Sequence, residues 1–404
     1  MITVYYGIPN KKINITNKLI PLKNNQNIIV IPNGDTLRDT LFSDPVPKVN
    51  KYIIIQLKGV SKPYMYSEHF NVYIDLFMFT QILFTPKLIV RGYIPPANNI
   101  QYPVNVFPIT FCIPEEKIVN TIPKKKKMLS SLIPWNNSTY LFNTEDTYYT
   151  EYKESMFGIT CLKAGWDCMR HYELMANGCI PYFIDLHECP KNTMAFLPKK
   201  LFAEGNELFH RIGAKKIAAL TRSELDLCNT HISKIVDYTR RHLTTCIMAN
   251  YILEKSNHTN VSKILYIGIN KPDYLSMLIL HGLKTRFGSK CHEYPKQPYL
   301  YKFNSDSNSN NVSELYGKGI TYSELLDINM RDDDLDQTLI HNIKDKYYDI
   351  IIYSTYHRSM LYYDLVNTVY SPNDIILLCG NDIHTCKYHT WANKKHPIFI
   401  REMD

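Results

Sequence analysis

The stretch FGITCLKAGWDCMRHYELMANGCIPYF, at residues 157–183, decides the fold of this chain. The apolar run at 156–161 predicts a short buried strand, and residues 168–177 follow a helical pattern that ends at Gly178. A glycine directly after such a pattern is typical of a helix C-cap. The next run, 179–184, predicts a second buried strand. Strand, helix and strand in this order indicate a parallel α/β sheet.

The same alternation returns downstream. Residues 263–269, 348–354 and 374–379 read as buried strands, and 272–287 read as a helix with one apolar face. Continuous apolar strands that alternate with helices predict a second parallel sheet covered on both faces. Two lobes of this kind flank a cleft, which is where ligands bind in open α/β sheets.

The N-terminal residues follow a different pattern. β-branched runs at 28–31 and 52–55 are separated by turn signals such as Asn33-Gly34-Asp35. We therefore expect three regions: a small β-rich module at 1–58, a first α/β lobe at 59–260 and a Rossmann-like lobe at 261–404.

The composition is that of a globular protein, with 45% hydrophobic and 21% charged residues among 404. The formal charge of +8 suits ligands that carry phosphate, although the excess is spread over a long chain. The dense basic run at 124–127 favours a solvated loop, and a loop that faces a diphosphate is the alternative.

Cysteine usage and the N-terminus predict a cytoplasmic protein. The 10 cysteines include no Cys-x-x-Cys pair, and the N-terminus lacks the pattern of a signal peptide. Free thiols in a reducing compartment follow most simply. The most apolar run, 70–84, is interrupted by polar residues and is too short to span a bilayer, so no membrane span is expected.

The densest polar constellation lies at 163–181. A diphosphate needs a cation and free backbone amides, and a ribose diol needs a carboxylate acceptor. Arg170 and Glu173 are three residues apart, so a helix presents them on one face. Gly165 permits a tight turn before that helix, and Asp167 is its expected N-cap. An ordinary helix with a surface ion pair is the alternative.

The segment RHYELMANGCIPYF at 170–183 resembles the donor-site motif of exostosin-type glycosyltransferases, which has an Arg, a Glu three residues later and a Gly-Cys-Ile-Pro turn. From about 107 to 208 the sequence looks closest to the exostosin-like transferases of giant DNA viruses. The resemblance implies two Rossmann-like lobes of GT-B type. It also implies metal-independent transfer of a sugar from a nucleotide sugar to a hydroxyl of a glycan or glycoprotein. A viral source would place the chain in the host cytoplasm or the virion.

The resemblance also implies the residues of the site. By position, Arg170 should meet the diphosphate and Glu173 the ribose. The expected donor-binding residues are Lys163, Gly165, Trp166, Asp167, Arg170, Glu173, Gly178, Cys179, Ile180 and Pro181. No cofactor, metal or nucleic acid is expected, because the nucleotide sugar is itself the substrate. The chain departs from the family at Met169, where exostosins have Ser, and in lacking their N-terminal membrane anchor.

The third region resembles the acceptor lobe of the same transferases through Asp273-Tyr274-Leu275, His281-Gly282-Leu283, Tyr294-Pro295-Lys296 and residues 315–319. That lobe normally comes first in the chain, whereas here it comes last. The two lobes would then be circularly permuted, with 59–260 as the donor lobe and 261–404 as the acceptor lobe. A permuted chain should bring residues 398–402 close to residues 106–113.

Inverting transfer would need a general base. Asp382 and His384 follow the strand at 374–379, at a carboxyl end where sites form, and are the candidates. An Asp-x-Asp at 332–334 sits in a polar stretch and is expected to be a solvated loop. A zinc site built from His384, Cys386 and His389 lacks a fourth ligand.

Two other functions stay open. A Rossmann-type methyltransferase would use 263–404 as its cofactor lobe, but no glycine-rich loop follows its first strand, and the residues at 163–181 stay unexplained. A non-catalytic carbohydrate-binding protein would use the β-rich module for binding.

Overall fold

The computed structural model describes residues 2–22, 28–32, 34–57, 63–68, 71–75, 89–91, 101–134, 136–269, 271, 273–302, 312, 315–382 and 388–403. The chain is a mixed α/β protein that divides into two compact units. The first contains Met1–Pro95 and Pro134–Asn137, and the second contains Pro96–Ile133 and Ser138–Asp404.

The described residues of the N-terminal unit form two antiparallel sheets and one α-helix, with two short 3-10 turns. One sheet has the order β2-β1-β4-β5, formed by Lys11–Asn14, Ile2–Ile8, Tyr52–Leu57 and Tyr64–Ser67. The other has the order β3-β6-β7, formed by Ile28–Ile31, Asn71–Asp75 and Ile89–Arg91. Alternate side chains of both sheets, such as Val4, Ile53 and Val72, share one core with Phe42 of α1 (Asp35–Phe42). The alternation is typical of sheets with one buried face.

This unit is larger than the sequence analysis expected. Strands β5 and β6 lie beyond residue 58 but pair with β4 and β3, and β7 pairs with β6. The turn signal at 33–35 also leads into a helix, α1, with Gly34 at its N-cap at a φ of +84°. Of the apolar run at 70–84, the structure describes residues 71–75, which form β6.

The second unit contains two parallel sheets. The smaller one has the order β11-β10-β9, formed by Ile180–Phe183, Ser155–Thr160 and Lys127–Leu129. Every residue of β10 and β11 is buried, as their continuous apolar sequences require in a sheet covered on both faces. The predicted strands at 156–161 and 179–184 are thereby confirmed.

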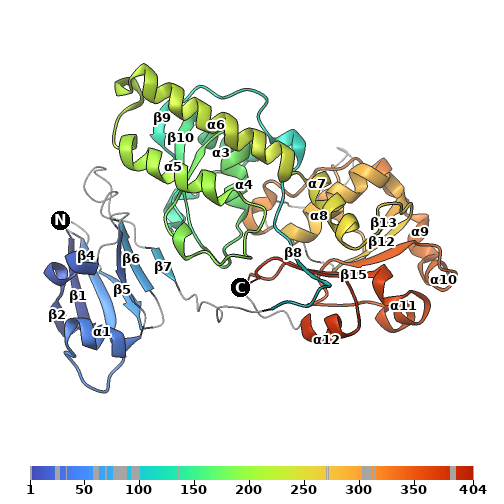
Figure 1. The fold of residues 1–404 in the computed structure, drawn as a ribbon, viewed down its shortest axis with the longest axis horizontal. Coiled ribbons are helices and arrows are strands. Elements are labelled where there is room, and N and C mark those ends of the chain that lie inside the picture. Colours follow the sequence, from blue (N-terminus) through green and yellow to red (C-terminus); the bar gives the residue numbers. More distant parts are fainter. Residues whose placement is uncertain are drawn as a thin grey trace. The chain divides into compact units, whose positions relative to one another are not determined.

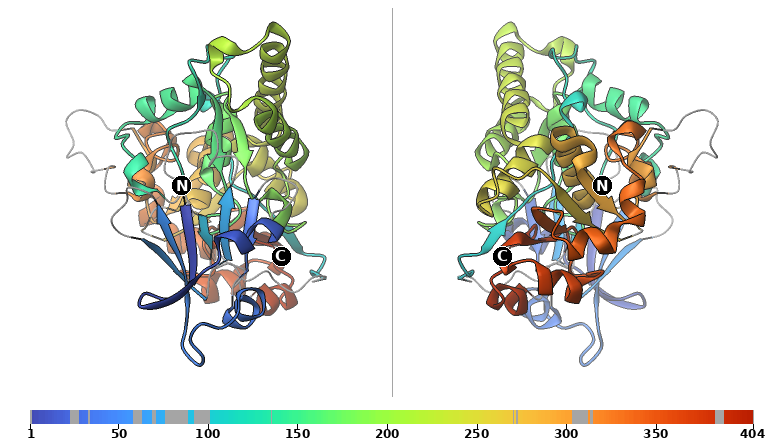
Figure 2. Two further views of the ribbon diagram at one scale, coloured as in Figure 1. Left: turned by 90° about the vertical axis from the view of Figure 1, so that its left-hand side faces the viewer. Right: turned by 90° about the vertical axis from the view of Figure 1, so that its right-hand side faces the viewer.

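Four helices accompany this sheet: α3 (Glu145–Glu154), α4 (Met169–Ala176), α5 (Lys199–Ile212) and α6 (Arg222–His242). The long α6, which runs beside the sheet in Figure 2, begins at a capping box of Thr221 and Glu224. Asn206 of α5 accepts a hydrogen bond from Phe183 N and donates one to Phe183 O, so it occupies polar groups on the edge strand β11.

The larger sheet has six parallel strands in the order β13-β12-β14-β15-β16-β8. In that order they are Cys291–Tyr294, Ile264–Ile267, Ile350–Tyr353, Ile375–Cys379, Ile398–Ile400 and Val106–Pro108. The accompanying helices are α7 (Thr245–Lys255), α8 (Tyr274–Phe287), α9 (Asp334–Gln337), α10 (Leu339–Lys344), α11 (Tyr363–Val369) and α12 (Tyr388–Asn393). The strand order reverses between β12 and β14, which is where doubly wound sheets bind ligands.

The last strand of this sheet comes from an early part of the chain. Ile398 pairs with Val106 and Ile400 with Pro108, so β16 and β8 are parallel neighbours (Figure 1). The predicted closeness of residues 398–402 and 106–113 is confirmed. Only 106–108 of the expected strand at 104–113 forms a strand, and Pro108 is its last residue.

The chain leaves the larger sheet and returns to it at adjacent points. Ile113 N donates to Leu243 O at 2.9 Å, and Thr245 N donates to Ile113 O at 3.1 Å. After the return, α7 packs directly on α8. The two helices are so close at Gly282 that an added Cβ would lie 2.1 Å from Thr245 O. The part of the chain that accompanies the smaller sheet therefore ends near residue 243, earlier than the expected 260.

The structure bears on two further expectations, the absence of a membrane span and the presence of free thiols. Among the described residues, no helix combines the length and apolarity needed to cross a membrane. Of the cysteines that the structure describes, eight are free thiols, as expected, whereas Cys379 is disulfide-bonded, so the expectation of free thiols throughout is wrong.

Candidate functional site

The carboxyl ends of strands from both parallel sheets meet in one place. Residues 161–168 follow β10 and residues 401–403 follow β16. The backbone amides of Trp166 and Asp167 donate to the carboxylate of Glu402, at 3.2 and 3.0 Å. Since ligands of parallel α/β sheets bind at these ends, this junction is the candidate functional site.

Two cations, Lys163 and Arg170, stand near one tyrosine ring. Arg170 Cζ lies 5.8 Å and Lys163 Nζ lies 5.6 Å from the ring centre of Tyr140. Arg170 is 7% exposed, and its Nη2 donates to the Tyr140 hydroxyl. Its Nη1 is buried without a hydrogen-bond partner among the described residues. A buried donor without a partner is costly, so an acceptor placed beside this nitrogen would lower the free energy of the folded state.

Glu173 follows Arg170 by one helical turn and ties three segments together. Thr321 Oγ1 donates to Glu173 Oε1 at 2.6 Å, and the Tyr148 hydroxyl donates to Oε2 at 2.6 Å. Burial raises the pKa of this carboxyl, and the two hydroxyls oppose the rise. Both oxygens are engaged by protein donors, so the carboxylate holds Thr321 against α3 and α4. Its predicted contact with a ribose stays a prediction.

A charged pair at the end of β16 joins the two sheets. Arg401 is fully buried, its Nε donates to Gly380 O at 3.2 Å, and its Nη1 donates to the backbone oxygen of Asp167. Its Nη2 pairs with Asp382, and its Cζ lies 4.3 Å from the ring centre of Phe111. One guanidinium thus contacts the ends of β15 and β16 and the turn before α4.

Glu402 is the second member of this pair. Its carboxylate is 6% exposed, accepts the two amides described above and lies 3.0 Å from Arg401 Nη1. Burial raises the pKa of Glu402 to about 7, although Arg401 and the amides oppose the rise. Gly165 packs closely beside it, because a Cβ at that position would lie 2.4 Å from Glu402 Oε1 and 2.9 Å from the backbone oxygen of Asp382. The turn that carries Lys163 is therefore fitted to one carboxylate, whose charge changes near neutral pH.

The prediction that Asp167 caps α4 is wrong. The N-cap residue is Cys168, which makes no side-chain capping bond. Asp167 is buried instead and accepts from Phe111 N at 2.6 Å and from the Tyr172 hydroxyl at 2.7 Å. The carboxylate of Asp167 therefore binds the backbone amide of Phe111, which is distant in the sequence, and not the amides at the start of α4.

Trp166 is held in the same turn by a buried histidine. His171 Nε2 lies 2.8 Å from Trp166 O, and His171 Nδ1 lies 2.8 Å from Thr160 Oγ1. Burial lowers the pKa of His171 to about 3, so the ring is neutral and donates to one oxygen while accepting from the other. The ring fixes the turn to the end of β10.

Residues 178–181 end α4 and begin β11, away from the turn that precedes α4. Gly178 has a φ of +63° and its amide bonds to Met175 O at 3.1 Å, while Cys179 N bonds to Leu174 O at 2.9 Å. These two bonds form a Schellman motif, which explains the glycine. Cys179, Ile180 and Pro181 are buried. The first six predicted donor-binding residues lie in the turn before α4 and on α4 itself, whereas the last four end the helix and begin β11.

The candidate bases are only partly described. The side chain of Asp382 is 55% exposed and held by Arg401. His384 and Cys386 lie outside the described residues, and His389 is exposed on α12. A further imidazole, His357, follows β14 and has two buried ring nitrogens without partners among the described residues. Burial, with Arg358 and Arg401, lowers its pKa to about 4, so it is a neutral acceptor at pH 7.

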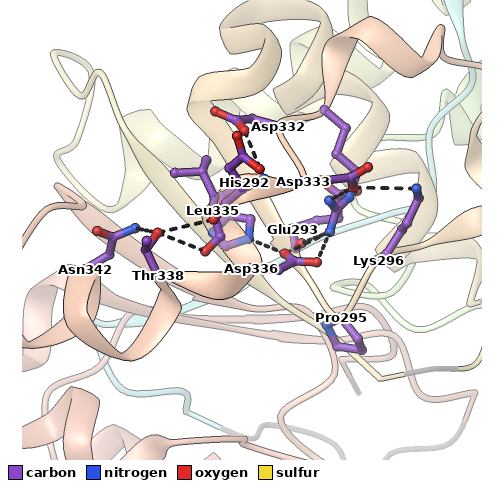
Figure 3. A network of polar contacts seen from close by, with 12 residues as sticks. His292, Glu293, Pro295, Lys296, Asp332, Asp333, Leu335, Asp336, Thr338 and Asn342 are labelled. Carbon is purple, nitrogen blue, oxygen red and sulfur yellow. Dashed lines mark hydrogen bonds and ion pairs between the residues drawn. The ribbon is translucent and has the colours of Figure 1, made fainter.

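The Asp-x-Asp at 332–334 belongs to a separate network of ion pairs (Figure 3). Its middle residue, Asp333, pairs with Arg331, which also lies 2.8 Å from Glu293 and 2.6 Å from Asp336. Asp332 and Asp334 are exposed, as expected for a solvated loop. Within the described part of the chain, no cluster of His, Cys, Asp and Glu could hold a metal ion.

The basic run at 124–127 forms the expected solvated loop only in part, because Lys124 and Lys126 are exposed whereas Lys127 begins β9. Lys125 is buried and its Nζ donates to Lys153 O at 2.9 Å. Lys126 pairs with Glu154, and Lys127 Nζ lies 2.6 Å from Glu151 Oε2. These cations meet the C-terminal turn of α3, where the helix dipole favours positive charge.

Sequence reasoning missed Arg401 and Glu402, which complete the junction, and Tyr140, Tyr148 and Thr321, which surround Arg170 and Glu173. A signal was present for the first two: an adjacent Arg and Glu follow the apolar run at 398–400, as polar residues do at the carboxyl end of a buried strand. The three hydroxyl residues have no such signal. Comparisons with known proteins add no identification, because no family model, curated protein or solved structure matches this chain.

Proposed function

We propose that this chain is a glycosyltransferase that moves a sugar from a nucleotide sugar to a hydroxyl of a glycan or glycoprotein. The observation that carries the proposal is Arg170, a buried guanidinium with an unpaired Nη1, next to Lys163 at the carboxyl ends of a parallel sheet. A diphosphate supplies the acceptor oxygens and negative charge that these two cations lack.

Such a site would act mainly on the leaving group. As the sugar departs, negative charge builds up on the diphosphate, and preorganised cations that are shielded from water stabilise that charge. Arg170 is fixed by Tyr140 and by its place in α4, so little rearrangement is needed when charge develops. Asp382 and His384 remain the proposed candidates for the base that activates the acceptor, and His357 joins them as a neutral imidazole.

The fold supports the two-lobed part of this proposal. We propose a GT-B-like arrangement with permuted lobes, in which the smaller sheet carries the donor site and the six-stranded sheet the acceptor site. The pairing of β16 with β8 supports the permutation, because it makes the chain's C-terminal strand a neighbour of the segment that leads into the donor lobe.

A ligand panel tests the substrate class. Because ligands that bind only the folded state raise its stability, we expect uridine or guanosine sugar nucleotides to raise the melting temperature. S-Adenosylmethionine should leave the melting temperature unchanged. Stabilisation by S-adenosylmethionine alone would support the methyltransferase alternative. Nucleotide-sugar binding without product on any glycan acceptor would support the non-catalytic alternative.

Removal of divalent metals tests the chemistry proposed for the cations. If Lys163 and Arg170 offset the diphosphate charge, transfer should survive excess EDTA, whereas Lys163→Met should reduce it. Lys302→Met is a matched control, since Lys302 is an exposed lysine paired with Asp327. Loss of transfer in EDTA that manganese restores would contradict a metal-independent site.

A further inference from the structure

Tyr316 presents an exposed aromatic ring beside the cations of the candidate site. Its side chain is 69% exposed, the largest exposed fraction of any tyrosine among the described residues. Lys163 Nζ lies 3.5 Å from the Tyr316 hydroxyl and 5.8 Å from the centre of its ring. The same Nζ lies 5.6 Å from the ring centre of Tyr140, against which Arg170 is also placed. The ring therefore lies one side chain away from the proposed diphosphate position.

The segment that carries this ring, residues 316–322, is firmly anchored, and we refer to it as the strap. Lys318 Nζ donates to Phe142 O at 2.8 Å, and Thr321 N donates to Glu145 Oε2 at 2.8 Å. The Tyr322 hydroxyl donates to the backbone oxygen of Tyr316 at 2.8 Å. With the bond from Thr321 to Glu173, these contacts fix the strap to α3, α4 and itself.

The backbone of the strap is also strained. Lys318 has a φ of +57° and Thr321 a φ of +77°, although a β-branched residue rarely adopts a positive φ. Gly317 is needed at its position, because a Cβ there would lie 2.3 Å from the Tyr274 hydroxyl. Strained backbone that surrounding contacts hold in place is typical of ligand clamps. The strap therefore holds the backbone of Tyr316 in place before any ligand binds, which lowers the entropy lost on binding.

We propose that Tyr316 is the stacking surface for the planar base of the nucleotide donor. This inference rests on the proposed function, since it assigns the base to the strap and the diphosphate to Lys163 and Arg170. Aromatic rings bind the faces of all nucleobases, so the platform contributes affinity with little choice among bases. Base selectivity would then come from groups other than Tyr316.

The test separates the base from the diphosphate. Calorimetric affinities for uridine diphosphate and for inorganic pyrophosphate are measured with wild type, Tyr316→Ala and Tyr316→Phe. Tyr316→Ala should weaken uridine diphosphate binding by about 5- to 150-fold, the range for loss of one base–aromatic stack. It should leave pyrophosphate binding unchanged, and Tyr316→Phe should keep wild-type affinity for both ligands.

Tyr347→Ala is the matched control, because Tyr347 is an exposed tyrosine with Lys263 Nζ 3.7 Å from its ring centre. It should change neither affinity. If Tyr316→Ala weakens the binding of both ligands equally, or does not weaken the binding of uridine diphosphate, Tyr316 is not the stacking surface. Binding of the ligands by wild type would in that case still support the proposed function. If wild type binds neither ligand, the proposed function fails, and the platform fails with it.

Discussion

Two arginine sites in the same unit treat buried charge in opposite ways. Arg331 lies 2.8 Å from Glu293 and 2.6 Å from Asp336, and Lys284 lies 2.6 Å from the other oxygen of Glu293. Arg170 has a tyrosine hydroxyl as its partner and leaves Nη1 unpaired. A buried charge that serves the fold is paired within the fold, whereas a buried charge with an open donor is suited to a ligand. The contrast is the structural basis for proposing Arg170, rather than Arg331, as the residue that binds a ligand.

Among the variants compared here, Glu293→Ala, at the Arg331 site, should cause the largest loss of folding free energy. It would leave Lys284 and Arg331 buried without their shared carboxylate, and such a change costs about 3–5 kcal/mol of folding free energy. Urea denaturation of wild type and Glu293→Ala measures the loss. Asp327→Ala, which removes an exposed partner of Lys302, is the control and should cost little. If Glu293→Ala costs no more folding free energy than the control, the Arg331 site does not stabilise the fold and the comparison fails.

The Arg401–Glu402 pair lies between these two cases, because its charges are paired but the carboxylate is costly to ionise. The pH dependence of folding stability measures this cost. Because the pKa of folded Glu402 is raised to about 7, the folded state binds a proton more tightly than the unfolded chain. The resulting stability is fully present below the unfolded pKa and is lost as pH rises through about 7. Wild type should therefore lose up to about 3 kcal/mol more than Glu402→Gln between pH 4.5 and 7.5. Parallel pH profiles of the two proteins would show that Glu402 titrates normally.

Arg170→Met should have the smallest effect on folding. Methionine fills a similar volume without a charge, and its introduction leaves no carboxylate buried without a partner, because Arg170 bonds to the neutral Tyr140 hydroxyl; we therefore expect a change below about 1 kcal/mol. Denaturation under the conditions used for Glu293→Ala checks this. A loss as large as that of Glu293→Ala would make Arg170 a structural residue and erase the contrast.

Sequence reasoning could find what local pattern encodes. The buried strands β10 and β11 and the helix between them follow from uninterrupted apolar runs and from the glycine at 178. It could not find contacts whose partners are remote in the chain. Thr321 and Glu173 are 148 residues apart, and Asp167 and Glu402 are 235 residues apart. For the same reason Asp167 was assigned to a helix cap, because local sequence offers that role and the competing amide of Phe111 belongs to another segment.

The closeness of residues 398–402 to residues 106–113 was predictable, although local sequence pattern does not encode it. Neither β16 nor β8 exceeds three residues, so periodicity alone says little about either. The prediction follows from the resemblance of the third region to an acceptor lobe that normally comes first in the chain, and the parallel pairing of Ile398 with Val106 confirms the closeness. Topology of this kind is a property of the whole chain, which short windows of sequence do not contain.

Calorimetric titration of uridine and guanosine diphosphate sugars into wild type and Arg170→Met tests the central claim most directly. Wild type should bind at least one of them saturably at one site. Arg170→Met should bind that ligand about 10- to 150-fold more weakly, since a hydrogen bond to a charged group contributes about 1.5–3 kcal/mol. Its folding stability should stay close to that of wild type. Equal affinity in the two proteins, or no binding by wild type, would contradict the assignment of Arg170 to the donor diphosphate.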